Sequence, residues 1–340
     1  MENIAVTLAR RPSGAPVAED FEVSVLSSPQ LKDGEVRTEN LYVSIDAGFR
    51  NWMDEGAGDD VLPAMVLGEP VMGLVLGRVC ESRNDRLAVG QLVMARLAWE
   101  QYSVLGPQDF AVPVAPLGDL PIRYHLGVLG DTGMSAYFGM TDIGRPRPGE
   151  TVLVSAAAGA VGSIAGQIAR NAGARVLGLA GTEEKCRRLV AELGYDEALN
   201  HRDPELDRAL ADACPDGIDV YFDNVGGPLL EVVLEHIAQG ARIPFCGAVA
   251  DYAREANASG PRNLFRLVTQ SALLQGFMTH LRVDRYPEAR AQLAGWLTAG
   301  EIVVPEAIHE GVEQCGVAFA DLFAGRNFGK TIVRVHADVD

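Results

Sequence analysis

The stretch VLVSAAAGAVGSIAGQIA, residues 152–169, constrains the fold more than any other part of the chain. An apolar run typical of a buried strand meets two glycines, Gly159 and Gly162, and a helix of small residues follows at once. Such glycines let a backbone approach a pyrophosphate and let the helix pack close to a sheet. The positive end of the helix then attracts the anion. The segment predicts a nucleotide-binding turn with Ala157 in place of the usual first glycine; a purely structural turn is the alternative.

The sequence after this turn alternates between apolar runs and amphipathic segments. The strands are apolar on both faces, as in a parallel sheet covered by helices. We expect strands at 151–155, 175–180, 198–199, 218–223 and 241–245, with residues 276–278 on the strand that follows, and helices at 161–172, 183–193, 229–237 and 286–299.

The first third of the chain has a different pattern. Short apolar runs between residues 20 and 115 are separated by Gly, Pro and Asp, which is typical of a β domain. Helical periodicity begins at residue 124 and continues through 138, and the tail after residue 301 returns to strands with one helix at 317–323. A chain of 340 residues is also too long for one ordinary core. The sequence therefore predicts an α/β domain with a parallel sheet at 123–309, inserted in a β-rich domain made of 1–122 and 310–340.

Charge and cysteine usage exclude several classes of protein. The formal net charge is −17, which disfavours nucleic acid and anionic membranes as partners. We expect neither a signal peptide nor a bilayer span. The five cysteines are scattered and odd in number, which fits reduced thiols better than a disulfide framework. The expectation is a soluble, cytoplasmic protein.

The end of the second strand of the α/β region indicates which dinucleotide is bound. An NAD site places an acid there for the ribose hydroxyls, but this chain has Gly181 followed by Thr182. Lys185 lies near the next helix start, and His201 and Arg202 follow the third strand. The glycine leaves room for a 2′-phosphate, and the neighbouring cations can pair with it. NADP(H) is therefore the favoured cofactor. The alternative is that residues 183–188 form an ordinary solvated helix face.

Longer motifs along the chain carry a family resemblance. They are GEPVMGLVLGRV, APLGDLPIRYHLGVLG, MSAYFGMTDIGRPRPGETVLVSAAAGAVGSIAGQIAR, AGTEEKCRRLVAELGYD, DNVGG and FGKTIVRV. Together they resemble the medium-chain dehydrogenase/reductase superfamily. The resemblance is strongest to its zinc-independent group of leukotriene B4 dehydrogenases, prostaglandin reductases and alkenal double-bond reductases. This implies a Rossmann domain with a doubly wound parallel sheet, inserted in a GroES-like substrate domain, together with NADPH and a homodimer.

The β domain lacks the ligands of a catalytic zinc. The segment that matches the zinc dehydrogenases reads Gly68-Glu69-Pro70, with no His before the Glu, and residues 46–50 contain no Cys. Without a Lewis acid, alcohol oxidation has no means of stabilising an alkoxide, whereas hydride addition to an activated C=C spreads charge into an enolate. We expect no metal, and NADPH-dependent reduction of the C=C bond of small apolar enones or enals. A quinone reductase of the same superfamily and an idle NADPH-binding protein are the alternatives.

Candidate site residues follow from the motifs and from the resemblance. Tyr252, in CGAVADYAREA, matches a family tyrosine proposed as proton donor or carbonyl ligand; an ordinary loop tyrosine is the alternative. Asn224 resembles a family residue near the nicotinamide, although a helix-capping Asx turn explains it too. The full cofactor set is Ala157, Gly159, Ala160, Val161, Gly162, Gly181, Thr182, Lys185, His201, Asn224, Cys246, Gly247, Phe277, Met278, Asn327 and Gly329. The expected substrate contacts are Arg50, Tyr252 and Met278.

Two segments depart from the family pattern. Asp46-Ala47-Gly48-Phe49-Arg50 stands where Asp-Pro-Tyr-Met-Arg is common, which we expect to open the pocket. Asp131-Thr132-Gly133 replaces the more usual Met-Pro-Gly, and the simplest interpretation of Asp131 is a cap for a helix that starts near Gly133.

Overall fold

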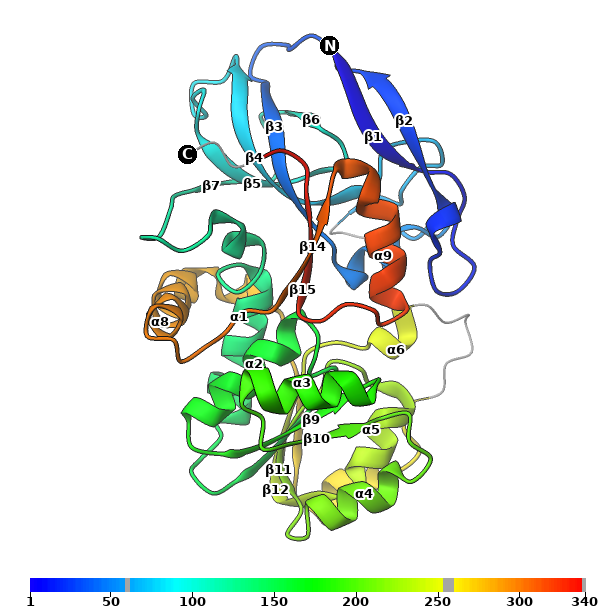
Figure 1. Ribbon diagram of the computed structural model, residues 1–340, viewed down its shortest axis with the longest axis vertical. Coiled ribbons are helices and arrows are strands. Elements are labelled where there is room, and N and C mark those ends of the chain that lie inside the picture. The colour runs from blue at the N-terminus through cyan, green and yellow to red at the C-terminus, as the bar shows by residue number, and fades with distance from the viewer. Residues whose placement is uncertain (59–61, 253–259, 338–340) are drawn as a thin grey trace. The chain divides into compact units, whose positions relative to one another are not determined.

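The computed structural model describes residues 1–58, 62–252 and 260–337. The chain divides into two compact units. We call the first the β-rich unit; it comprises Met1–Gly127, Glu306–Asn327 and Thr331–Asp340. The second, Val128–Pro305 with Phe328–Lys330, is called the parallel-sheet unit. Both are drawn in Figure 1.

The parallel-sheet unit is built on a six-stranded parallel sheet. Its strand order is β10 (Glu197–Asn200), β9 (Arg175–Ala180), β8 (Thr151–Val154), β11 (Ile218–Phe222), β12 (Ile237–Phe245) and β13 (Leu273–Gly276). The chain winds outward from β8 in one direction and then from β11 in the other. The carboxyl ends of β8 and β11 therefore border a topological switch point, where open α/β sheets bind their ligands.

Helices connect and cover these strands, as Figure 1 shows for α2 to α5. The unit contains α1 (Asp131–Phe138), η4 (Gly139–Gly144), α2 (Ala160–Asn171), α3 (Glu183–Leu193), α4 (Leu206–Ala213), α5 (Gly227–Leu234), α6 (Val249–Tyr252), α7 (Phe265–Thr269), η5 (Thr279–Arg285) and α8 (Tyr286–Thr298). Leu153, Leu177, Tyr221 and Ile243 are fully buried between the sheet and its helices. This layered core confirms the predicted α/β class with a parallel sheet.

The β-rich unit holds a seven-stranded sheet and a separate two-stranded ladder. The ladder pairs β1 (Glu2–Leu8) with β2 (Phe21–Ser27). The larger sheet contains β3 (Val36–Ser44), β4 (Met72–Ser82), β5 (Leu92–Ala98), β6 (Tyr102–Leu105), β7 (Ala111–Val114), β14 (Glu306–Glu310) and β15 (Lys330–Arg334). Its core contains Trp99 and Phe319, whose rings meet edge to face at 5.5 Å, and Phe319 belongs to α9 (Cys315–Phe323).

Some predicted elements were wrong in detail. The helix expected to run from 124 to 138 is interrupted, because the 3-10 helix η3 (Ile122–Leu126) has Gly127 as its C-cap and α1 begins only after Gly130. The helix expected at 229–237 ends at Leu234, since Ile237 already starts β12. Helix α4, with Leu206 and Leu210 as its buried positions, was not predicted.

Two local expectations near the site were also wrong. Met278 and Phe277 were expected on a strand, but β13 ends at Gly276. Asp131 is itself the first residue of α1, and the N-cap position belongs to Gly130.

Among the described residues, no helix combines the length and apolar character that a membrane span requires.

Candidate cofactor and substrate site

The turn between β8 and α2 has the geometry that its glycines predict. Gly159 is the N-cap of α2 and donates its N–H to the carbonyl of Ala156 at 2.8 Å. A Cβ on Gly162 would lie 2.4 Å from that same carbonyl oxygen, so no larger residue fits there. Ala157 is fully buried, and its methyl group faces Gly178 of β9. The first fingerprint position therefore packs against the sheet, which explains how an alanine is accommodated.

The amino terminus of α2 is suited to an anion. The cap residue contributes no side-chain hydrogen bond, and the first turn, which includes Ala160 and Val161, carries no acidic residue. The first N–H groups of a helix lack intrahelical partners and carry partial positive charge. Gly329 lies beside this turn, because it forms a parallel bridge to Gly159 and donates its N–H to the carbonyl of Ala158 at 2.8 Å.

A cluster of cationic side chains surrounds the end of β9. A Cβ on Gly181 would lie 3.3 Å from Nε2 of His201 and 3.4 Å from Nε of Arg202. Burial lowers the pKa of Lys185, and the positive charge of Arg202 lowers it further. Burial and the same guanidinium also lower the pKa of His201. Within the described part of the chain, Lys185, His201 and Arg202 have no acidic partner. Their mutual repulsion would be relieved by a dianion such as the 2′-phosphate of NADP(H).

Other charged side chains of α3 already have polar partners. Arg188 forms an ion pair with Glu192 at 2.6 Å and lies over the ring of Phe328, so it fits the solvated-face interpretation. Glu183 accepts a hydrogen bond from Asn200 at 2.9 Å. Thr182 caps α3 by accepting from the backbone N–H of Lys185 at 3.3 Å. Lys185 therefore differs from Arg188 and Glu183, because its side chain has no acidic partner among the described residues.

A buried hydrogen-bond network joins the ends of β8 and β11. Asn224 donates its backbone N–H to Oγ of Ser155 at 2.9 Å and its side-chain amide to the Ser155 carbonyl at 2.7 Å. Asp223 accepts from the hydroxyls of Ser155 and Tyr221 and from two N–H groups of the following turn. Burial raises the pKa of Asp223 against those hydrogen bonds. The Asx turn expected of Asn224 thus belongs to Asp223.

Ser155 and Asp223 were missed as site-building residues. An acid directly after a buried strand and before Asn-Val-Gly-Gly was an available signal for Asp223. No sequence pattern pairs it with Ser155, which lies 68 positions earlier.

The turn after β12 connects Tyr252 with this network. Cys246 and Gly247 both donate their N–H groups to the carbonyl of Asp223, at 2.8 and 3.3 Å. The hydroxyl of Tyr252 lies against Gly247, 3.2 Å from where a Cβ would stand. Burial raises the pKa of Tyr252, so its phenol stays protonated at neutral pH. Asn224, Cys246, Gly247 and Tyr252 therefore lie together beyond the carboxyl ends of β11 and β12, beside the topological switch point. We call this place the switch-point edge of the sheet.

The remaining predicted residues are placed in different ways. The ring of Phe277 packs near Gly139, while Met278 is 53% exposed. Arg50 and Asn327 belong to the β-rich unit. The buried guanidinium of Arg50 donates to the Pro12 and Gly14 carbonyls and pairs with Asp54 at 2.8 Å. A substrate contact for Arg50 and a cofactor contact for Asn327 stay predictions.

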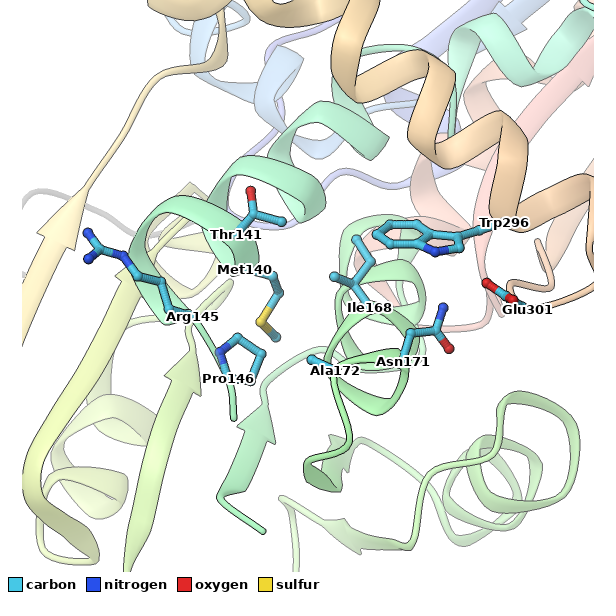
Figure 2. A pocket seen from close by; sticks show the side chains of 9 residues that line it. All are labelled: Met140, Thr141, Arg145, Pro146, Ile168, Asn171, Ala172, Trp296 and Glu301. Atoms are coloured by element: carbon cyan, nitrogen blue, oxygen red, sulfur yellow. The ribbon is translucent and has the colours of Figure 1, made fainter. Parts of the chain in front are cut away.

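A hollow of about 570 Å³ opens elsewhere in the parallel-sheet unit. Figure 2 shows Met140 of η4 and Ile168 of α2 pointing into it, with Trp296 above Ile168. It lies at the Asn171 end of α2, about 18 Å from the capped end at 1.5 Å per residue. It contains none of the predicted site residues.

Among the residues described, no group of three or more His, Cys, Asp or Glu side chains is placed to hold a metal ion. The phosphate-binding turn and the cation cluster, by contrast, fit NADP(H).

Comparison with known proteins identifies the family. Residues 5–112 match the family described as the N-terminal domain of oxidoreductase, and residues 160–295 match the zinc-binding dehydrogenase family. The chain is 43% identical to the protein YfmJ of Bacillus subtilis (strain 168), over 97% of both chains. It is 36% identical to the NADP(+)-dependent 2-alkenal reductase of Nicotiana tabacum, over 98% of both.

A solved structure agrees with these relatives. The crystal structure of CurA from Vibrio vulnificus in complex with NADPH is 35% identical and has a TM-score of 0.89. The match covers 98% of this chain and 100% of that one. The protein therefore belongs to the medium-chain dehydrogenase/reductase superfamily, in its group of alkenal double-bond and prostaglandin reductases.

Proposed function

We propose that the protein reduces the C=C bond of α,β-unsaturated ketones and aldehydes with NADPH. The observation that carries the proposal is the position of Tyr252, whose hydroxyl lies against Gly247 at the switch-point edge of the sheet. Relatives named as an NADP(+)-dependent 2-alkenal reductase and an NADPH-dependent curcumin reductase support the reaction class.

The cofactor would rest on three sets of groups in the parallel-sheet unit. The amino terminus of α2 and Gly159 would hold the pyrophosphate, and Lys185, His201 and Arg202 would hold the 2′-phosphate. The backbone of Cys246 and Gly247, with Asn224, would border the nicotinamide. When bound, NADPH supplies the hydride that adds to the β-carbon of the acceptor.

Tyr252 would act on the charge that this addition creates. As the C–H bond forms at the β-carbon, the π electrons move toward the carbonyl oxygen, and the α-carbon then takes up a proton. A neutral phenol donates a hydrogen bond to that oxygen without ionising, which stabilises the enolate. The burial of Tyr252, which raises its pKa, keeps it in this donor form.

An assay of NADPH oxidation separates the three candidate functions. A panel of simple enones and enals is compared with a panel of quinones, and the absorbance of NADPH is followed. We expect turnover with enones and little with quinones. Preference for quinones would favour the quinone reductase, and NADPH binding without turnover of either panel would indicate an idle binding protein.

We propose that the protein forms a homodimer through the edge of its parallel sheet. Within the described residues, β13 pairs with β12 on one side and with no strand on the other. Large apolar side chains are exposed on and near this edge, namely Leu264, Phe265, Val268, Leu273 and Leu281. Unpaired edges flanked by apolar surface are favourable pairing sites. Light scattering should give twice the chain mass, and Val268→Asp should give the monomer; a monomeric parent protein contradicts the proposal.

A cytoplasmic location completes the proposal. All five cysteines are free thiols, and Cys186, Cys214 and Cys315 are buried. Such thiols fit a reducing compartment.

A further inference from the structure

The carboxylate of Asp131 is held in place by two hydroxyl groups. Its Oδ1 accepts hydrogen bonds from Oγ1 of Thr279 and, at 3.2 Å, from the hydroxyl of Tyr286. Thr279 is buried, and burial raises the pKa of Tyr286 to about 12, so both partners remain donors at neutral pH. Asp131 itself is exposed. Within the described residues, its second oxygen, Oδ2, has no hydrogen-bond partner.

This carboxylate lies at the proposed reaction site. Thr279 directly follows Phe277 and Met278, two of the predicted cofactor contacts. Burial raises the pKa of the Cys246 thiol to about 12, and the negative charge of Asp131 contributes to that shift, so the two side chains are electrostatic neighbours. Cys246 in turn contributes to raising the pKa of Tyr252. The Tyr252 hydroxyl lies against Gly247, the residue after Cys246, so Asp131 interacts electrostatically with the turn that Tyr252 contacts.

A role in helix stability does not account for this arrangement. An acid in the first turn of a helix interacts favourably with the helix dipole, which α1 gains from Asp131 at its first position. That interaction needs no hydroxyl partners. The two donors come from η5 and α8, far along the chain, and they fix the carboxylate with one oxygen unused.

We propose that Asp131 determines the specificity of the reductase by selecting neutral enones and enals against acceptors that carry a carboxylate on the C=C bond. The inference rests on the proposed function. A second negative charge about 6 Å from Asp131 is repelled by roughly 0.7–1.4 kcal/mol in surroundings of high dielectric constant, which corresponds to about three- to tenfold. A neutral acceptor experiences no such repulsion.

The test uses two acceptors that share one enone skeleton: methyl (E)-4-oxopent-2-enoate, which is neutral, and the free (E)-4-oxopent-2-enoate anion. The readout is the ester-to-acid ratio of kcat/KM at saturating NADPH. The parent protein should prefer the ester, and Asp131→Asn should reduce the ratio by roughly three- to tenfold. Glu301→Gln removes one charge beside the distant hollow and should leave the ratio unchanged.

A measurement on the unaltered protein guards against a folding defect in the variant. Salt screens exposed charges, so raising the ionic strength should also lower the ester-to-acid ratio. A ratio that responds neither to Asp131→Asn nor to salt overturns the specificity role. Failure of the proposed function looks different: the parent protein would bind NADPH and yet reduce neither the ester nor a simple enone such as 3-nonen-2-one.

Discussion

The hydroxyl of Tyr195 donates a 2.7 Å hydrogen bond to the carbonyl oxygen of Gly162. Tyr195 is fully buried and follows α3, whereas Gly162 lies in the first turn of α2. The bond therefore ties α2, the helix proposed to bind the pyrophosphate, to the neighbouring βα unit. Gly166 makes room for it, since a Cβ there would lie 2.1 Å from the tyrosine hydroxyl. The glycines of α2 thus serve packing against Tyr195, in addition to the cofactor approach that we propose for them.

Loss of this hydrogen bond should destabilise the parallel-sheet unit. Tyr195→Phe leaves the buried carbonyl of Gly162 without its side-chain donor, so we expect the free energy of unfolding to fall by about 1 kcal/mol. Gly166→Ala forces a methyl group into the ring of Tyr195 and should cost about 1–3 kcal/mol, despite the better helix propensity of alanine. Urea unfolding measures both. Equal stability of all three proteins would mean that the contact contributes nothing.

The cation cluster should discriminate between the two nicotinamide dinucleotides. Lys185→Ala or Arg202→Ala removes a charged partner of the 2′-phosphate, so the Kd for NADPH should rise by about 10- to 100-fold. The Kd for NADH should change less than about twofold, because NADH has no phosphate at that position. Arg187→Ala, on the exposed side of α3, is the matched control and should affect neither. Equal losses for both dinucleotides would remove the 2′-phosphate role.

Tyr252 should affect turnover far more than cofactor binding. Tyr252→Phe keeps the ring and removes the hydrogen-bond donor to the enolate oxygen, so we expect kcat to fall by about 10²-fold or more. The Kd for NADPH should stay within about twofold, as fluorescence titration would show. Because burial raises the pKa of Tyr252, its donor form persists above the ordinary tyrosine value of about 10. A phenylalanine variant with parental kcat would show that water or another group supplies the hydrogen bond.

The sequence was sufficient for elements whose signals are local. Helix α3 was predicted with its observed bounds of 183 and 193, because a capping Thr182 and a terminal Gly194 mark its ends. The nucleotide turn was found because strand, glycines and helix are contiguous. The NADP(H) preference was predicted because Gly181 and Lys185 are close together in the sequence.

What the sequence could not predict depends on contacts between distant residues. The network of Ser155, Asp223 and Asn224 forms only when β8 and β11 pair in the sheet. The clustering of Asp131 with Thr279 and Tyr286 likewise requires the folded unit. Local propensity carries no information about such pairs, so Asp131 was interpreted as a simple cap.

The ion pair between Glu150 and Arg242 should make stability depend on pH. Burial would raise the pKa of Glu150, but the hydrogen bonds from Arg242, at 2.5 and 3.1 Å, and from the N–H of Arg147 outweigh it and lower the pKa. A lowered folded-state pKa gives stability that is complete above the unfolded value of about 4.3 and is lost as pH falls through the folded value. Glu150→Gln should therefore cost about 1–2 kcal/mol at pH 7.

That cost should diminish progressively below about pH 4, where the parent protein loses the same charge. Urea unfolding of the parent and the variant across this range provides the comparison. The control is Glu192→Gln, which removes the exposed partner of Arg188 and should cost no more than about 0.5 kcal/mol. A penalty for Glu150→Gln that is the same at pH 7 and at pH 4 or below would contradict the ion-pair explanation.

The fate of the transferred hydride tests the proposed function most directly. The protein is incubated with NADPH that carries deuterium at the reactive C4 position and with a simple enone, and the product is analysed by NMR. The proposed function predicts the saturated ketone with deuterium on the β-carbon and with the α-carbon proton taken from solvent. An allylic alcohol with deuterium on the former carbonyl carbon, or a complete lack of transfer despite bound cofactor, would contradict it.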